Sequence, residues 1–184
     1  MLLTKYDVRK RIATMKSLLE EVDKIAASEA VFSRLESNAA FQLAEKVLLY
    51  HSLPDELGTH RFLNRWKDRK QFFLPRVNGV HLELLPYEES RLEIGSFHIE
   101  EPTGNEVHEV DEMEVIVVPG VAFDRKGRRL GRGKGFYDRL LKTAKGLKVG
   151  VGYEFQLVDE LPAEEHDVPM DIVITEHTTI ITKK

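Results

Sequence analysis

The segment EVIVVPG, residues 114–120, contains four consecutive β-branched residues followed by a Pro-Gly pair. A continuous run of this kind is typical of a strand that is covered on both faces, as in parallel sheets. Similar, shorter runs occur in KVLLYHS (46–52), KVGVGY (148–153) and DIVIT (171–175). Helical patterns lie between these runs, and such alternation predicts an α/β fold with a largely parallel central sheet. We therefore expect a single three-layer α/β/α domain spanning residues 1–184.

Helices are expected in three regions. Apolar residues recur at helical spacing from residue 4 to residue 36, which predicts one long helix or a helix interrupted near residues 26–28. A turn followed by a helix is predicted for PDELGTHRFLNRWKDR (54–69), and another helix for FYDRLLKTA (136–144). Residues 155–169 are expected to be irregular, with at most one helical turn.

A hairpin is expected in the middle of the chain. QFFLPRV (71–77) and HLELLPY (81–87) have the composition of strands, and Asn78-Gly79 between them favours a tight turn. Residues 90–104 follow no regular pattern and are expected to form a loop.

Composition narrows the class of protein. Apolar residues make up 42% of the chain and charged residues 32%, which is typical of a soluble globular protein. The absence of cysteine excludes disulfides, thiolate zinc sites and thiol nucleophiles. The seven histidines show no HxH or HExxH spacing, and no GxSxG motif suggests a serine nucleophile. The N-terminal residues lack a signal-peptide pattern and no apolar run could cross a bilayer, so we expect a cytoplasmic protein without a membrane partner.

Positive charge is concentrated in one segment. The whole chain carries a net charge of −4, but residues 125–145 contain nine Lys or Arg and a single acid, Asp138. The remainder of the chain therefore carries −12. This balance argues against general nucleic-acid binding, whereas a compact basic patch suits a small polyanion. Lys5 and Arg9 are one helical turn apart, so they could bind one anion together.

The glycine-rich core of this segment is RLGRGKGFYD, residues 129–138. It is not a Walker A loop, because Gly135 rather than Ser or Thr follows Lys134, and it lacks the third glycine of a dinucleotide-binding fingerprint. Its alternating glycines still allow backbone N–H groups to approach a phosphate. Arg132 would add positive charge, and Asp138 could hold a magnesium ion beside the phosphates.

Each of these features also has an ordinary structural interpretation. The loop could be a solvated charged turn, and Asp138 could merely complement the N-terminus of a helix. Phe136 and Tyr137 could be core residues. The residues alone leave both interpretations open.

The longer segment VVPGVAFDRKGRRLGRGKGFYDRLL (117–141) closely resembles the signature of the 5-formyltetrahydrofolate cyclo-ligase family, PGxxFDxxGxRLGxGxGYYD. One position departs from it, because Phe136 replaces the first tyrosine. Five shorter segments resemble other parts of the family's sequence more weakly: Lys5-x-x-x-Arg9, SLPDEL around Glu56, FFLPRV, FHIEEP and HDVPMDIVIT. The Phe136 position keeps a stacking surface but loses a hydroxyl group, which could alter folate affinity.

The resemblance implies an enzyme that uses ATP and Mg²⁺ to convert 5-formyltetrahydrofolate into 5,10-methenyltetrahydrofolate. It implies a monomer with a small-molecule substrate and no nucleic-acid partner. Implied ATP contacts are Lys5, Arg9, Arg129, Leu130, Gly131, Arg132, Gly133, Lys134, Gly135, Phe136 and Tyr137. Implied folate contacts are His51, Glu56, Arg132, Gly133, Lys134, Gly135 and Phe136. Lys134 and Arg132 are the implied catalytic residues, and Asp138 and Asp171 the implied magnesium ligands.

Three other functions are compatible with the basic glycine loop. A sugar-phosphate isomerase would need a general base, for which Glu56 is a candidate, and no ATP. A nucleic-acid binder would use the patch at 125–145 and would show salt-dependent affinity. In a structural domain, the loop would only reverse the chain.

Overall fold

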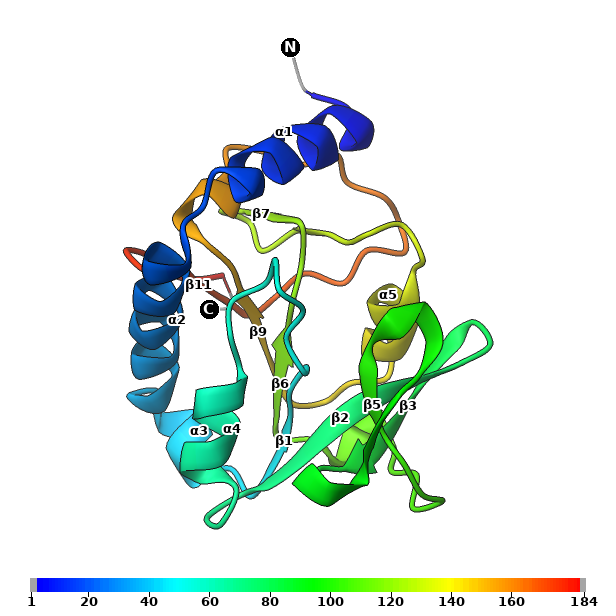
Figure 1. The fold of residues 1–184 in the computed structure, drawn as a ribbon. Helices are drawn as coiled ribbons and strands as arrows, with labels where there is room; N and C mark the ends of the chain where they lie inside the picture. The colour runs from blue at the N-terminus through cyan, green and yellow to red at the C-terminus, as the bar shows by residue number, and fades with distance from the viewer. Residues whose placement is uncertain (1–2, 183–184) are drawn as a thin grey trace.

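A seven-stranded sheet forms the centre of the protein in the computed structural model, which describes residues 3–182 (Figure 1). The strand order is β12-β11-β9-β6-β1-β2-β3. The strands are β1 (Lys46–Leu48), β2 (Gln71–Asn78), β3 (His81–Pro86), β6 (Val115–Val118), β9 (Leu147–Val151), β11 (Ile172–Ile174) and β12 (Thr179–Ile181). Neighbours from β11 to β2 are parallel, and only the two edge strands pair antiparallel. The largely parallel sheet is thereby confirmed.

Helices cover both faces of this sheet. They are α2 (Glu21–Glu36), α3 (Ala39–Leu43), α4 (His60–Trp66) and α5 (Phe136–Leu141), whereas α1 (Lys5–Ser17) packs on a second, smaller sheet. All four residues of β6 are buried, as a strand covered on both faces requires. Val115 and Val117 pack with α2, α3 and α4, whereas Ile116 and Val118 pack with α5 on the other face. The alternation along a single strand therefore builds the predicted three layers.

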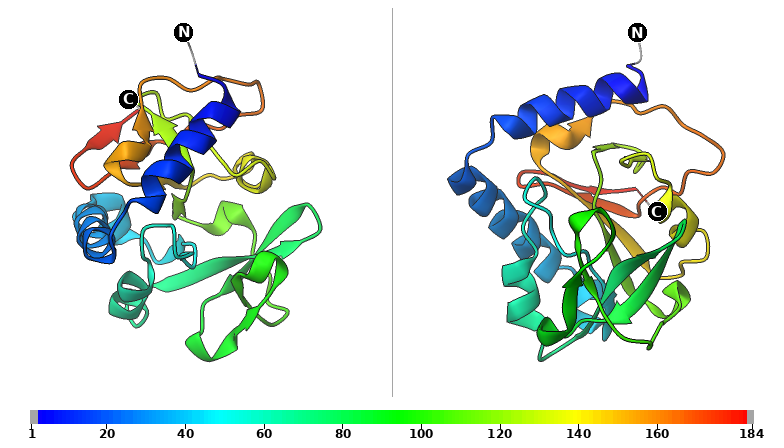
Figure 2. Two further views of the ribbon diagram at one scale, coloured as in Figure 1. Left: turned by 45° about the horizontal axis from the view of Figure 1, so that its top comes forward. Right: turned by 45° about the vertical axis from the view of Figure 1, so that its right-hand side comes forward.

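A second, smaller sheet lies beside the carboxyl ends of the central strands. It consists of β7 (Ala122–Asp124), β8 (Arg129–Leu130) and β10 (Leu157–Val158). Val8 and Ile12 of α1 are buried against Ala122 and Leu130 of this sheet. Figure 2 (right) shows α1 beside the segment that contains β10. Packing on the small sheet places α1 next to the glycine loop.

The first helical region is divided, but not where the sequence suggested. Residues 26–28 lie inside α2, and the break falls at residues 18–20. Leu18 ends α1, and Glu20 has the extended conformation that precedes α2. This break contains neither Gly nor Pro. It arises because α1 packs on the small sheet and α2 on the central sheet.

The predicted hairpin is confirmed, since β2 and β3 pair antiparallel. Its turn lies one residue later than predicted, at Gly79-Val80, because Asn78 still pairs with His81; the φ of Gly79 is 63°. The expected loop at 90–104 is wrong, because β4 (Leu92–Ile94) and β5 (Glu100–Pro102) form a two-stranded antiparallel sheet. These strands have only three residues each, so no alternating pattern could develop in the sequence. Short 3₁₀ turns are η1 (Glu89–Arg91), η2 (Ser96–His98), η3 (Val110–Glu112) and η4 (Glu154–Gln156).

Candidate active site

A cleft of about 580 Å³ opens at the carboxyl edge of the central sheet. Pro119 and Gly120, which follow β6, line it together with Tyr50, which follows β1. This is the edge at which open α/β sheets bind ligands. Every predicted site residue except Asp171 lines the cleft: Lys5, Arg9, His51, Glu56, Arg129, Leu130, Gly131, Arg132, Gly133, Lys134, Gly135, Phe136, Tyr137 and Asp138.

The glycine loop, residues 131–135, connects β8 to α5 along one wall of this cleft. Gly133 and Gly135 have φ values of 103° and 71°, in the left-handed region that disfavours other residues. Gly135 also precedes the first turn of α5. That helix ends at Leu141 rather than at residue 144, and it has only six residues. The backbone conformation of the loop, more than the dipole of so short a helix, is therefore suited to surround an anion.

Arg129 forms part of the cleft floor. Its Nε donates a hydrogen bond of 2.6 Å to the carbonyl oxygen of Pro119, and its guanidinium lies 4.9 Å from the ring centroid of Tyr137. Burial lowers the pKa of Arg129 and raises that of the Tyr137 hydroxyl. A Cβ at Gly131 would lie 3.0 Å from Arg129 Nη1, so glycine permits this close packing.

Helix α1 supplies positive charge next to the glycine loop. Arg9 donates from Nε to the carbonyl oxygen of Gly131 at 2.9 Å. Lys5 forms an ion pair with Glu164. Lys5 and Arg9, which lie one helical turn apart, both line the cleft.

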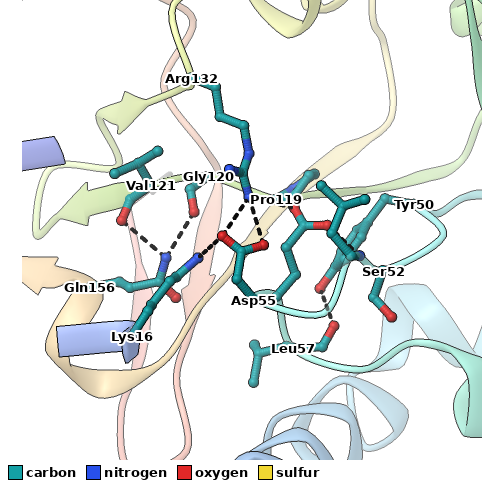
Figure 3. A network of polar contacts seen from close by, with 12 residues as sticks. Lys16, Tyr50, Ser52, Asp55, Leu57, Pro119, Gly120, Val121, Arg132 and Gln156 are labelled. Atoms are coloured by element: carbon teal, nitrogen blue, oxygen red, sulfur yellow. Dashed lines mark hydrogen bonds and ion pairs between the residues drawn. The ribbon is translucent and has the colours of Figure 1, made fainter. Parts of the chain in front are cut away.

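Glu56, from the loop after β1, lines the cleft, and its neighbour Asp55 pairs with Arg132 (Figure 3). Glu56 Oε1 accepts a hydrogen bond of 2.8 Å from the backbone N–H of Leu53. Burial raises the pKa of Glu56, although this hydrogen bond and Arg132 oppose the shift. Arg132 Nη2 lies 4.0 Å from Glu56 Oε2, so the predicted folate and phosphate contacts meet at this point.

Aromatic side chains form another wall. Phe97 lies 6.3 Å from Phe136 between ring centroids, and Lys134 Nζ lies 5.4 Å from the Phe97 ring. Phe97 and His98 both have positive φ, near 59° and 57°. Strained backbone of this kind is concentrated at functional sites. Sequence reasoning did not identify Phe97 as a site residue, although it begins the FHIEEP segment, because only the pairing of β4 and β5 brings it to the cleft.

His51 also lines the cleft. Its Nδ1 is 3.3 Å from Glu100 Oε2, and its ring stacks on His60 with centroids 4.0 Å apart. Burial and the neighbouring His60 lower the pKa of His51. Glu101, a buried carboxylate that accepts from Val77 N–H at 2.7 Å, also lines the cleft. Neither Glu100 nor Glu101 was identified as a site residue from the sequence.

The structure separates the two predicted metal ligands, because Asp138 lines the cleft and Asp171 does not. Asp171 lies at the amino end of β11, on the opposite edge of the sheet from the cleft. Its Oδ2 accepts from Lys148 N–H at 2.9 Å and lies 3.5 Å from Lys148 Nζ, so Asp171 joins β11 to β9. Asp138 instead lies close to Asp167 and His166. One ligand atom from each of these three residues lies within 4.8 Å of the other two. Asp167 is only four positions before Asp171, in the same segment HDVPMD.

This geometry suits two ligands side by side. The cationic side chains and the loop backbone can hold phosphate groups, while Glu56 and the aromatic wall can hold a planar ring with N–H donors. The carboxylates of Asp138 and Asp167 are the oxygen ligands that Mg²⁺ prefers, although His166 is not a preferred ligand. Within residues 3–182, no helix combines the length and apolar character needed to cross a membrane.

Comparisons with known proteins agree with this geometry. The family model of 5-formyltetrahydrofolate cyclo-ligases matches residues 3–176. The 5-formyltetrahydrofolate cyclo-ligase of Haemophilus influenzae is 31% identical over 180 residues, which cover 91% of this chain and 95% of that protein.

Solved structures give the same result. The 5,10-methenyltetrahydrofolate synthetase of Aquifex aeolicus has a TM-score of 0.90 and 37% identity, covering 99% of this chain and 94% of the other. The fold is shared with the 5,10-methenyltetrahydrofolate synthetase of Mycoplasma pneumoniae, with a TM-score of 0.77 and 23% identity over 95% and 99% of the two chains. The chain belongs to the 5-formyltetrahydrofolate cyclo-ligase family.

Proposed function

We propose that this protein uses ATP to convert 5-formyltetrahydrofolate into 5,10-methenyltetrahydrofolate, with release of ADP and phosphate. Membership of the family supports ligase activity on a folate, within one-carbon metabolism. The observation that supports the proposal best is the meeting of Arg132 and Glu56, 4.0 Å apart in one cleft. It places a cation of the glycine loop beside a carboxylate suited to a pterin ring.

The reaction must activate a formyl amide whose oxygen is a poor leaving group. The γ-phosphoryl group of ATP passes to the formyl oxygen, with ADP as the leaving group. N10 of the folate then attacks the formyl carbon and loses its proton, and the C–O bond breaks as phosphate leaves. Such a transfer depends mainly on alignment and on stabilisation of charge.

The glycine loop and α1 would supply this stabilisation. Arg132 and Lys134 would contact the phosphate groups from the loop, and Lys5 and Arg9 from the helix. All four side chains line the same cleft. Fixed donors in a protected cleft stabilise the developing charge more effectively than mobile water does.

Asp138 and Asp167, with His166 nearby, are the residues that would hold Mg²⁺. When bound, this ion would neutralise negative charge on the phosphate oxygens. The proposal replaces Asp171 by Asp167, because only Asp167 reaches the cleft.

Glu56 would bind the pterin by accepting hydrogen bonds from its amino group and ring N–H. This role requires the carboxylate to be ionised or to share a proton with the ring. Phe97 and Phe136 would pack against the folate rings, because both line the cleft with their rings 6.3 Å apart. His51 would complete this side of the site.

A spectrophotometric assay tests the proposal directly. The protein is mixed with ATP, Mg²⁺ and 5-formyltetrahydrofolate, and the methenyl product is followed by its absorbance. Omission of any one component should abolish product formation. Product without ATP would contradict phosphoryl activation, and no product from folded protein in the complete mixture would refute the proposed function.

A further inference from the structure

A three-residue ionic network connects α1, the loop after β1 and the glycine loop. Asp55 is its centre (Figure 3). Arg132 Nη2 donates to both carboxylate oxygens of Asp55, at 2.9 and 3.0 Å. Lys16, in the last turns of α1, places its Nζ 3.7 Å from Asp55 Oδ2. The three residues lie in segments that are far apart in the sequence.

The network keeps its central carboxylate charged. Burial opposes ionisation of Asp55, but Lys16 and Arg132 outweigh it and lower the pKa of this carboxyl group. The Lys16 side chain is only 10% exposed, whereas the Asp55 and Arg132 side chains are 45% and 52% exposed. The Asp55–Arg132 pair is therefore open to exchange with an incoming anion, while Lys16 stays in place.

Arg132 also belongs to the proposed phosphate site. The donor Nη2 that Asp55 uses is oriented toward the loop after β1, beside Glu56. A phosphate oxygen that takes this donor must displace a carboxylate from it, since both anions compete for the same N–H groups. Asp55 therefore lowers the affinity of Arg132 for a phosphate oxygen at this donor, by at most the strength of the ion pair.

We propose that Asp55 is a positioning residue, which holds Arg132 until a phosphate group of the nucleotide displaces it. This inference rests on the proposed function, because it assumes that the anion is a nucleotide phosphate. Lys16 has the opposite effect on the same carboxylate. By neutralising part of its charge, Lys16 weakens the hold of Asp55 on Arg132 and facilitates the exchange.

Substitutions of Asp55 and of Lys16 should act in opposite directions. Asp55→Asn removes the competing charge, so ATP should bind about two- to fivefold more tightly, the range expected for a partly exposed ion pair. Lys16→Met leaves Asp55 fully available to Arg132, so ATP should bind more weakly by a similar factor. In an Arg132→Ala background, neither substitution should change the affinity.

The measurement is ATP binding by calorimetry with Mg²⁺ present, together with steady-state kinetics. Asp55→Asn should lower KM for ATP more than it changes kcat, which loss of structure would not do. If Asp55→Asn folds poorly, Lys16→Met is compared in the wild-type and Arg132→Ala backgrounds. Weaker ATP binding only when Arg132 is present supports the proposal, whereas unchanged binding, or the same weakening in both backgrounds, overturns it.

Unchanged or weaker ATP binding by folded Asp55→Asn protein would overturn the role of Asp55. If Asp55→Asn and Lys16→Met changed the ATP affinity as much in the Arg132→Ala background as in the wild type, the role of Asp55 would also be overturned, because the effect would not depend on Arg132. Failure of the wild-type protein to bind ATP would be a different result, and it would refute the proposed function itself.

Discussion

Arg9 donates a hydrogen bond of 2.9 Å from its Nε to the carbonyl oxygen of Gly131, and thereby joins the first helix to the glycine loop. A Cβ built on Gly133 would lie 3.8 Å from Arg9 Nη2, so the outer part of the guanidinium also lies next to the loop. The helix thus adds positive charge directly beside the glycine loop.

Arg9→Ala should therefore weaken nucleotide binding. A hydrogen bond to a charged group contributes about 1.5–3 kcal/mol, which corresponds to roughly a tenfold to hundredfold rise in KM for ATP. Lys10→Ala is the matched control, because Lys10 is exposed on the same helix and does not line the cleft. Equal effects of the two substitutions in steady-state kinetics would contradict a specific role for Arg9.

Lys134→Ala should lower turnover much more than it lowers stability. Loss of one donor that stabilises transition-state charge typically reduces kcat by about 10²–10³-fold. Lys142→Ala provides the control within the same basic segment, since Lys142 is exposed beyond α5. Normal turnover by Lys134→Ala, with an unchanged melting temperature, would show that the loop lysine is not catalytic.

Asp167→Asn and Asp171→Asn should separate metal binding from stability. Asp167→Asn should raise the Mg²⁺ concentration needed for activity, because Asp167 faces Asp138 in the cleft. Asp171→Asn should lower the free energy of unfolding by about 1–3 kcal/mol, since it weakens a charged hydrogen bond between two strands. Thermal unfolding and Mg²⁺ titration of activity measure the two effects, and a reversed pattern would restore Asp171 as the metal ligand.

Glu56→Gln should stabilise the free protein while it weakens folate binding. Burial raises the pKa of Glu56 above its ordinary value of 4.5, so the folded state favours the protonated form. The contribution of Glu56 to stability is then present below pH 4.5 and is lost as the pH rises through the higher pKa of the folded state. The melting temperature of Glu56→Gln should exceed that of the wild type at pH 7 and match it near pH 4.

Folate kinetics complete this test. KM for 5-formyltetrahydrofolate should rise in Glu56→Gln, because a neutral amide cannot replace a carboxylate that accepts two N–H groups. KM for ATP should change less. A destabilised protein at pH 7 would show that ionised Glu56 is well compensated in the folded state.

Local pattern alone determined the central strand, the hairpin and the glycine loop. The β6 run is apolar on both faces, Asn78-Gly79 suits a tight turn, and residues 131–135 need positive φ at two glycines. Each of these features depends on a few consecutive residues, so periodicity and turn chemistry could predict them. The family signature lies in the same segment, and for that reason nearly all predicted site residues line one cleft.

Only the tertiary structure decided the remaining features. The break before α2 is set by packing on two different sheets, and β4 and β5 are too short to produce a pattern. The choice of Asp167 over Asp171 depends on which of two nearby carboxylates lies at the carboxyl edge of the sheet. The role inferred for Asp55 depends on Lys16 and Arg132, which lie 39 and 77 positions away in the sequence. Contacts between distant segments form only when the chain is folded, and no local pattern of residues encodes them.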